Sequence, residues 1–240
     1  MRKLILVIFS VLTTLAVAAQ DFSNKGKDFY LCFPNHIPSG SNLAKLSIWI
    51  TSDKASSGTI TMANGAFAST FNIPANGIAE IAVPYADAHI GTAETSNDAN
   101  IIVLQKSIRV KVDVGKPPVV AYVQQYAAAR SAASLLLPVN VLGKKYYAIS
   151  AAQDGTGGGK SQFQVIAVKD NTVIEITPVK DGVKQPTFTV NLPLAGDMIQ
   201  YQSNDPNSAS QDLTGTLIES IASGSGGCMP IAVFSGSSST

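Results

Sequence analysis

The feature that most constrains this chain is a series of short, strand-like segments separated by turn residues. Residues 107–114 are the clearest case, because Ile108, Val110 and Val112 fall on one face of a strand and charged residues alternate with them. Similar segments recur, rich in β-branched and aromatic residues and bounded by Gly, Pro, Asn and Asp. The others are residues 46–51, 58–62, 67–73, 77–83, 101–104, 118–125, 145–151, 162–168, 172–178, 187–192, 197–203, 215–221 and 230–235. Long helical periodicity is absent, so the sequence predicts an all-β protein with antiparallel sheets and little helix.

The strand-like segments form two similar sets. Residues 70–77 and 189–196 match at Thr, Asn, Pro and Gly with a constant shift of 119 positions. Two further matches, before and after this one, occur in the same order along the chain, which favours an internal duplication. We therefore expect two tandem antiparallel β-sandwich repeats, residues 20–133 and 134–240, with the second truncated at its C-terminal end.

Specific residues test this arrangement. We expect Pro74 and Pro193 each to end a strand, and Gly77 and Gly196 each to open the next one through a tight turn. The best helix candidate is residues 126–133, where an Ala-rich composition favours a turn or two of helix.

The first 19 residues have the pattern of a secretory signal peptide. A cationic start, Met1-Arg2-Lys3, precedes a predominantly apolar run that ends in small residues at Val17-Ala18-Ala19. The run is shorter than the ~20 apolar residues that cross a bilayer, and no later segment reaches that length without charges or Pro. The sequence thus predicts a signal peptide at residues 1–19, export to the extracellular space or cell surface, and no membrane insertion after cleavage.

Composition argues against several classes of function. The chain has 17 Lys and Arg against 16 Asp and Glu, and a net charge of +1, so no polybasic surface is expected and nucleic acid is not a predicted partner. Two Cys and two His are too few for a Cys-cluster or His-rich metal site, and we predict no metal and no cofactor. Cys32 and Cys228 lie near opposite ends of the mature chain, and the sequence leaves open whether they form a disulfide.

No motif indicates nucleophilic catalysis or phosphate binding. His36 lies in an expected turn and His89 in a polar loop, and each is interpreted as a solvated loop histidine rather than as a catalytic base. The Gly-rich residues 154–161 have Asp154 where a P-loop requires Gly, and a strand pattern rather than a helix follows them. We interpret that stretch as a flexible loop between strands.

Acidic residues provide no assignable site. Residues 204–207 with residues 211–212 offer oxygen atoms for Ca²⁺, but they lack the spaced Asp pattern of a calcium loop, and turn formation explains them. A glycosidase needs a spatial pair of carboxylates, which a sequence does not assign. The candidates are Glu80, Glu94, Glu175 and Glu219. We therefore predict that the protein is not an enzyme and has no catalytic, cofactor-binding or metal residue.

Six segments in order along the mature chain are similar to the IgGFc-binding protein N-terminal domain family. They are residues 26–34, 116–122, 134–147, 163–178, 212–216 and 230–236. The resemblance implies an extracellular β-rich module of a kind found in mucus-type proteins of animals and in large surface proteins of Bacteroidetes-like bacteria, some tied to gliding or adhesion. The signal peptide and the lack of Asn-x-Ser/Thr acceptors favour the bacterial branch.

The leading interpretation is a non-catalytic extracellular binding or adhesion module of a longer surface or secreted polypeptide, with a glycan or a protein as ligand. The alternative is a secreted enzyme or an accessory carbohydrate-binding domain, and a structural spacer is a third hypothesis. Residues 46–51 are apolar on both faces, so we expect a central or covered strand in which Trp49 makes a contact rather than forming an open patch.

Overall fold

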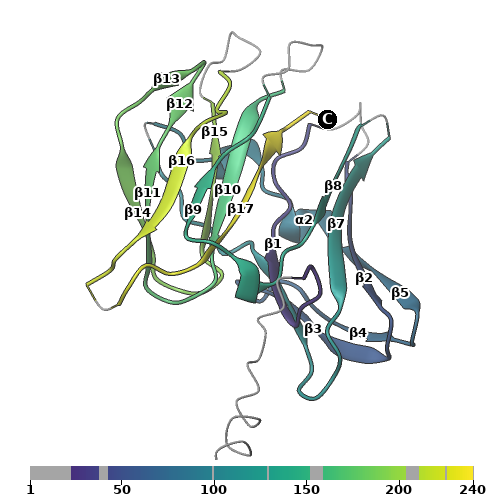
Figure 1. Ribbon diagram of the computed structural model, residues 1–240. Helices are drawn as coiled ribbons and strands as arrows, with labels where there is room; N and C mark the ends of the chain where they lie inside the picture. The colour runs from purple at the N-terminus through teal and green to yellow at the C-terminus, as the bar shows by residue number, and fades with distance from the viewer. Residues whose placement is uncertain are drawn as a thin grey trace, which may run out of the picture.

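The protein consists of two β-sandwiches side by side (Figure 1). The computed structural model describes residues 23–37, 43–98, 100–128, 130–151, 159–203, 211–224 and 226–239. The expected signal peptide, residues 154–158 of the Gly-rich loop and residues 204–207 lie outside the described residues. Among the described residues, no helix has the length and apolar character needed to cross a membrane. The prediction of an all-β, antiparallel fold with little helix is confirmed.

The first sandwich contains eight strands in two four-stranded sheets. These strands are β1 (Asp28–Leu31), β2 (Lys45–Ser52), β3 (Ser56–Met62), β4 (Ala68–Ile73), β5 (Gly77–Val83), β6 (Ile108–Val112), β7 (Val120–Ala127) and β8 (Arg130–Leu135). One sheet has the order β1-β6-β3-β4 and the other β5-β2-β7-β8. The helix α2 (Tyr85–Ala88) and the 3₁₀ turn η1 (Thr92–Glu94) lie between β5 and β6.

The second sandwich follows the 3₁₀ turn η2 (Val139–Val141). Its strands are β9 (Lys145–Tyr147), β10 (Ser161–Ala167), β11 (Thr172–Thr177), β12 (Val179–Lys180), β13 (Val183–Lys184), β14 (Phe188–Leu192), β15 (Met198–Gln202), β16 (Leu217–Ile221) and β17 (Ile231–Ser237). One sheet has the order β14-β11-β16-β9 and the other β15-β10-β17, while β12 and β13 form a separate hairpin.

The two sandwiches share one strand order. The sheet β9-β16-β11-β14 repeats β1-β6-β3-β4, and β15-β10-β17 repeats β5-β2-β7. Pro74 directly follows β4 and Pro193 directly follows β14, and in each sandwich the chain then crosses to the other sheet. Gly77 begins β5, whereas Gly196 lies two residues before β15 with a φ of +99°. The first sandwich differs by the additional edge strand β8.

The expected helix at residues 126–133 is wrong. Ala127 ends β7, the chain reverses through a turn with Ala128 at a φ of +52°, and Arg130 begins β8 antiparallel to β7. Ala favours helices only weakly, and the hairpin contacts with β7 override that preference. The expected division after residue 133 therefore falls inside a strand of the first sandwich.

Each sandwich has its own core, and a third hydrophobic cluster joins them. Phe29 and Ile60 pack in the first core, and Phe163 and Ile174 in the second. Between the sandwiches lies the joining cluster, which consists of Tyr30, Cys32, Ile90, Ile166, Val168, Met198 and Ala232. Because the sheet of β10 has a core on one side and the first sandwich on the other, all seven residues of β10 are buried.

Trp49 lies on the outer face of β2. This strand is central, between β5 and β7, as the two apolar faces of the segment predicted. Its side chain is half-buried, and its indole N–H donates to Gln124 Oε1 at 3.0 Å. The residue opposite it on β7, Tyr122, is 40% exposed. Trp49 thus makes the expected contact, but on a sheet face that is turned away from the second sandwich (Figure 1).

Candidate functional site

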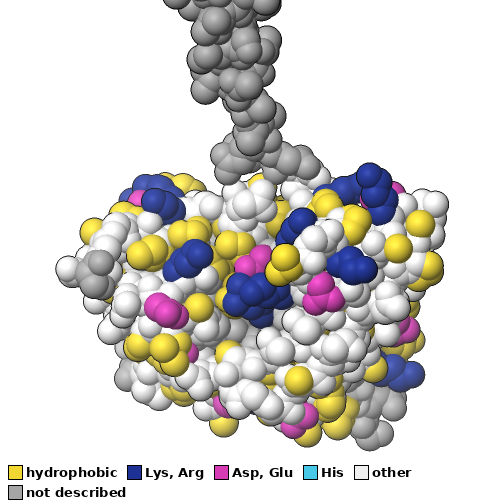
Figure 2. Space-filling view, turned by 90° about the horizontal axis from the view of Figure 1, so that it is seen from below, with side chains coloured by type: hydrophobic (Ala, Val, Ile, Leu, Met, Phe, Trp, Pro, Cys, Tyr) yellow, Lys and Arg dark blue, Asp and Glu magenta, His cyan; other side chains and the backbone are white. Residues whose placement is uncertain are grey.

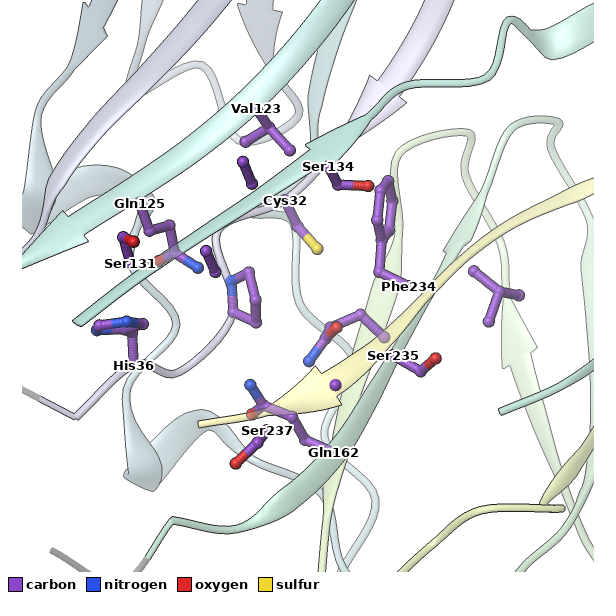
Figure 3. Close-up of a pocket in the computed structure, with 16 residues that line it drawn as sticks. Cys32, His36, Val123, Gln125, Ser131, Ser134, Gln162, Phe234, Ser235 and Ser237 are labelled. Carbon is purple, nitrogen blue, oxygen red and sulfur yellow. The ribbon is translucent and has the colours of Figure 1, made fainter. Parts of the chain in front are cut away.

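A cavity of about 450 Å³ lies where the two sandwiches meet (Figure 3). Its volume is in the range of sites that hold small molecules or short segments of a larger ligand. The lining residues are Cys32, Pro34, His36, Val123, Gln125, Ser131, Ala132, Ala133, Ser134, Gln162, Gln164, Val233, Phe234, Ser235, Gly236 and Ser237. They come from the segment after β1, from β7 and β8, and from β10 and β17.

The strand β8, which extends its sheet by one strand beyond the repeated order, supplies part of the cavity wall. In Figure 3 the side chains of Gln125 and Ser134 lie to the left and right of Cys32, and those of Gln162 and Ser237 lie below it. The first pair belongs to β7 and β8 of the first sandwich, and the second pair to β10 and β17 of the second. The site is therefore built jointly by both sandwiches.

The lining of the cavity combines apolar side chains with polar ones, and it carries no charge apart from the titratable ring of His36. Among the sixteen residues there is no Asp, Glu, Lys or Arg. Three Gln side chains and several Ser hydroxyls provide both donors and acceptors. Such a surface suits a ligand that offers hydroxyl or amide groups, because a charged ligand would lose its hydration without gaining an ion pair.

Two buried side chains of the lining have polar atoms without hydrogen-bond partners among the described residues. His36 is 2% exposed and both of its ring nitrogens lack a partner, and Gln125 is 4% exposed and its Oε1 lacks one. Buried polar atoms are normally paired, and an unpaired one costs about 1–3 kcal/mol. These atoms are available to a ligand that enters the cavity.

Other amides beside the cavity are fixed in a network. Gln164 Nε2 donates to Gln200 Oε1 at 3.2 Å, and Gln200 Nε2 donates to the hydroxyl of Thr95 at 2.8 Å. Gln162 Nε2 donates to the carbonyl oxygen of Asn35 at 2.9 Å. Because these bonds connect both sandwiches, they hold the walls of the cavity in place.

The structure brings together the two histidines that the sequence placed in separate loops. The backbone N–H of His36 donates to His89 Nε2 at 3.2 Å, and the His89 ring stacks on Tyr85 with centroids 4.3 Å apart. The expectation of solvated loop histidines is wrong, because His36 is buried and His89 is half-buried.

Both histidines favour the neutral form. Burial lowers the pKa of His89 to about 4, and the nearby charge of Lys106 contributes in the same direction. Burial also lowers the pKa of His36, with a contribution from Arg130. At neutral pH the site therefore presents His36 as an uncharged ring with one N–H donor and one acceptor.

The cysteines do not form a disulfide, so the open question from the sequence is answered in favour of free thiols. Cys32 is buried at the cavity and Cys228 is partly exposed in the second sandwich. Burial raises the pKa of the Cys32 thiol, which keeps it protonated and unreactive.

The four candidate carboxylates lie outside the cavity. Glu175 and Glu219 are direct cross-strand neighbours on β11 and β16, but Lys145 forms an ion pair with Glu219 at 2.7 Å. Glu80 accepts a hydrogen bond from Ser47, and Glu94 accepts one from Lys106. Among the described residues, no group of three or more His, Cys, Asp or Glu is arranged to hold a metal ion.

Of the proposed calcium cluster, only residues 211–212 are described. The Asp212 Oδ1 accepts from the N–H of Thr214 at 2.9 Å, and Gly215 has a φ of +92°. Asp212 therefore stabilises a turn, which is the interpretation that the sequence favoured.

Charged residues gather elsewhere on the surface. Figure 2 shows a face on which Lys and Arg side chains lie among Asp, Glu and hydrophobic ones. A second hollow of about 360 Å³ is lined by Lys25, Lys27, Lys54, Lys116 and Asp53, among others. Lys25 forms an ion pair with Asp53 at 3.2 Å, so part of that positive charge is already compensated.

The fold and the cavity define an all-β protein of two tandem sandwiches with an uncharged cleft between them. A sequence model of the IgGFc binding protein family matches residues 132–240, which is less than half of the chain. The matched range begins inside β8 and continues through β17, so it includes part of one strand that borders the cleft and all of the other. No match was found among curated proteins or among solved structures.

The sequence did not reveal the cleft, although one signal for it is present. Gln162 and Gln164 alternate with apolar residues in β10, and Gln200 and Gln202 do so in β15. Uncharged amide side chains in two neighbouring strands indicate a face of the sheet that does not pack in a hydrophobic core and is not exposed to solvent. This face is the wall that the second sandwich contributes to the contact with the first.

Proposed function

We propose that this protein is a non-catalytic, extracellular binding module that holds its glycan or protein ligand in the cleft between the two sandwiches. The observation that carries the proposal is an uncharged cavity of about 450 Å³ in which His36 and Gln125 have buried polar atoms without partners among the described residues. A ligand that satisfies these atoms gains hydrogen bonds at buried positions where the described protein residues supply none.

The family match supports binding rather than catalysis. Its name refers to a protein that binds the Fc part of IgG, and the match includes β8 and β17. The signal-peptide pattern at residues 1–19 supports export, and the wider resemblance supports a place in a longer surface or secreted polypeptide of the bacterial branch, with a role in adhesion. The shared strand order of the two sandwiches supports an origin by duplication.

The test compares two neighbouring glutamines of β7. Gln125 faces the cleft, whereas Gln124 faces the opposite side of the sheet and accepts from Trp49. The protein comprising residues 20–240 and its Gln125→Ala and Gln124→Ala variants are screened on glycan and glycoprotein arrays. We expect ligands whose binding falls at least tenfold with Gln125→Ala and less than twofold with Gln124→Ala.

Two results would contradict the proposal. Binding that is insensitive to Gln125→Ala would place the ligand elsewhere and refute the cleft as the site. The enzyme alternative is tested with chromogenic glycosides and peptides. Turnover that is abolished by Glu175→Gln or Glu219→Gln would show that the protein is catalytic.

A further inference from the structure

The cleft is bordered by the edges of two strands, and this bears on the kind of ligand it takes. β8 lies at the edge of one sheet and β17 at the edge of another. Residues 131–134 of β8 and residues 233–237 of β17 line the cavity without interruption. Successive side chains of a strand point to opposite faces, so an uninterrupted run means that the strand edges themselves border the cavity.

The hydrogen bonds of β17 show which of its backbone groups point to that edge. The N–H of Ser238 donates to the carbonyl oxygen of Lys160 at 2.9 Å, in the register of the β10–β17 ladder. Hydrogen-bonded pairs alternate along an antiparallel ladder, so Gly236 and Phe234 also bond to β10. The N–H and C=O groups of Val233 and Ser235 therefore point away from β10. Among the described residues these groups have no backbone partner.

The same alternation applies to β8. The N–H of Leu136 donates to the carbonyl oxygen of Ala121 at 2.9 Å, so Ser134 and Ala132 bond to β7. The backbone groups of Ala133 therefore point away from β7, and the structure shows no backbone partner for them among the residues it describes. Both strands thus present unpaired backbone groups at the border of one cavity.

A glycine of β17 leaves room for a close approach. Gly236 lines the cavity, and a Cβ added there would meet no atom within 4 Å. A glycine inside a strand often marks a place where another backbone or a ligand comes near.

We propose that the cleft captures an extended, uncharged segment of a partner polypeptide by strand addition to the β17 edge. The segment pairs with the outward N–H and C=O groups of Val233 and Ser235, and β8 lies along its other side. Its polar side chains reach Gln125 and His36. The uncharged lining disfavours charged side chains in the segment, because no lining residue replaces their hydration with an ion pair. This inference rests on the proposed function and specifies the ligand class.

The experiment uses the protein comprising residues 20–240 and two probe sets, an array of uncharged eight-residue peptides and an array of neutral oligosaccharides. The strongest peptide is then resynthesised with one backbone N-methyl group at each position in turn. Strand addition uses every second N–H of the ligand, so we expect affinity losses of at least tenfold at alternate positions and small losses between them.

Two glycine variants complete the test. Gly236→Val fills the cavity, whereas Gly227→Val places the same side chain in the open space of a loop outside it. We expect Gly236→Val to reduce peptide affinity at least tenfold and Gly227→Val to leave it within twofold. Thermal unfolding of both variants establishes that they are folded.

Three results would overturn strand addition. The first is an N-methyl scan without a two-residue period, and the second is peptide binding that is unchanged by Gly236→Val. The third is binding of oligosaccharides alone. If that oligosaccharide binding is lost with Gln125→Ala, the proposed binding module stands and only the peptide inference fails. If neither array binds, both proposals fail.

Discussion

The contact between the two sandwiches depends on Ile166, and its truncation to Ala tests whether they unfold as one unit. Ile166 belongs to β10 of the second sandwich, but its fully buried side chain packs in the cluster that joins the two. Met198 and Ala232 are its cross-strand neighbours in the same cluster. The side chain of Ile166 is not part of the core of the second sandwich.

The expected loss of stability follows from the carbons removed. Ile166→Ala removes three carbons, and at ~0.8 kcal/mol for each buried CH₂ the transfer contribution is about 2.4 kcal/mol. The space left behind adds to this, so the total loss is about 3–4 kcal/mol. If the sandwiches were separate in solution, the side chain would face water, and its truncation would cost less than about 0.5 kcal/mol.

Urea unfolding of the protein comprising residues 20–240 measures this difference. Trp49 is the only Trp and lies in β2, so its fluorescence reports on the first sandwich. With a slope of about 1–3 kcal/mol per molar urea, Ile166→Ala should lower the midpoint seen by Trp49 by about 1 M. The shift would show that a change in the second sandwich destabilises the first.

The matched control is Ile174→Ala, since Ile174 is also fully buried but lies in the core of the second sandwich. Far-UV circular dichroism follows the unfolding of both sandwiches. If Ile174→Ala lowers the midpoint by circular dichroism while Ile166→Ala changes neither signal, the joining cluster contributes no stability and the cleft lacks a fixed geometry.

Three further predictions concern single residues. Gly196→Val should cost about 1–3 kcal/mol of unfolding free energy, because the φ of +99° is strained for Val. Equal midpoints for Gly196→Val and the Gly227→Val control would contradict this. His89 has a pKa of about 4 when folded and about 6.5 when unfolded. The unfolded chain therefore binds more protons between these values, so stability should fall as the pH is lowered from about 6.5 to about 4. In urea titrations at several pH values, His89→Asn should reduce that fall, and an unchanged dependence would refute the assignment. A thiol reagent should modify Cys228 in the folded protein and the buried Cys32 only on unfolding. Two thiols reacting at the same rate would show that the cleft is open at Cys32.

Where strands occur was largely predictable because alternation is a local signal. Residues 77–83 are β5 as expected, and residues 172–178 contain β11. One predicted strand is wrong because its segment lacks local alternation. Residues 101–104 form no strand, and only Leu104 makes an isolated bridge. The turn at Asp212 was predictable because a carboxylate and a following Gly define it within four residues.

The sequence by itself determined the all-β class of the fold and the two similar sets of strands. It also determined that β10 and β15, which carry glutamines, are uncharged. A period of two residues fixes which side chains share a face of a sheet, and it needs no knowledge of the partner. The sequence did not determine what each face meets. Ala-rich residues 130–135 became the edge strand β8 only through pairing with β7, and Gln164 became buried only through the contact between the sandwiches. That contact joins residues far apart in the chain, so the cleft and the unpaired atoms of His36 and Gln125 were decided by the tertiary structure alone.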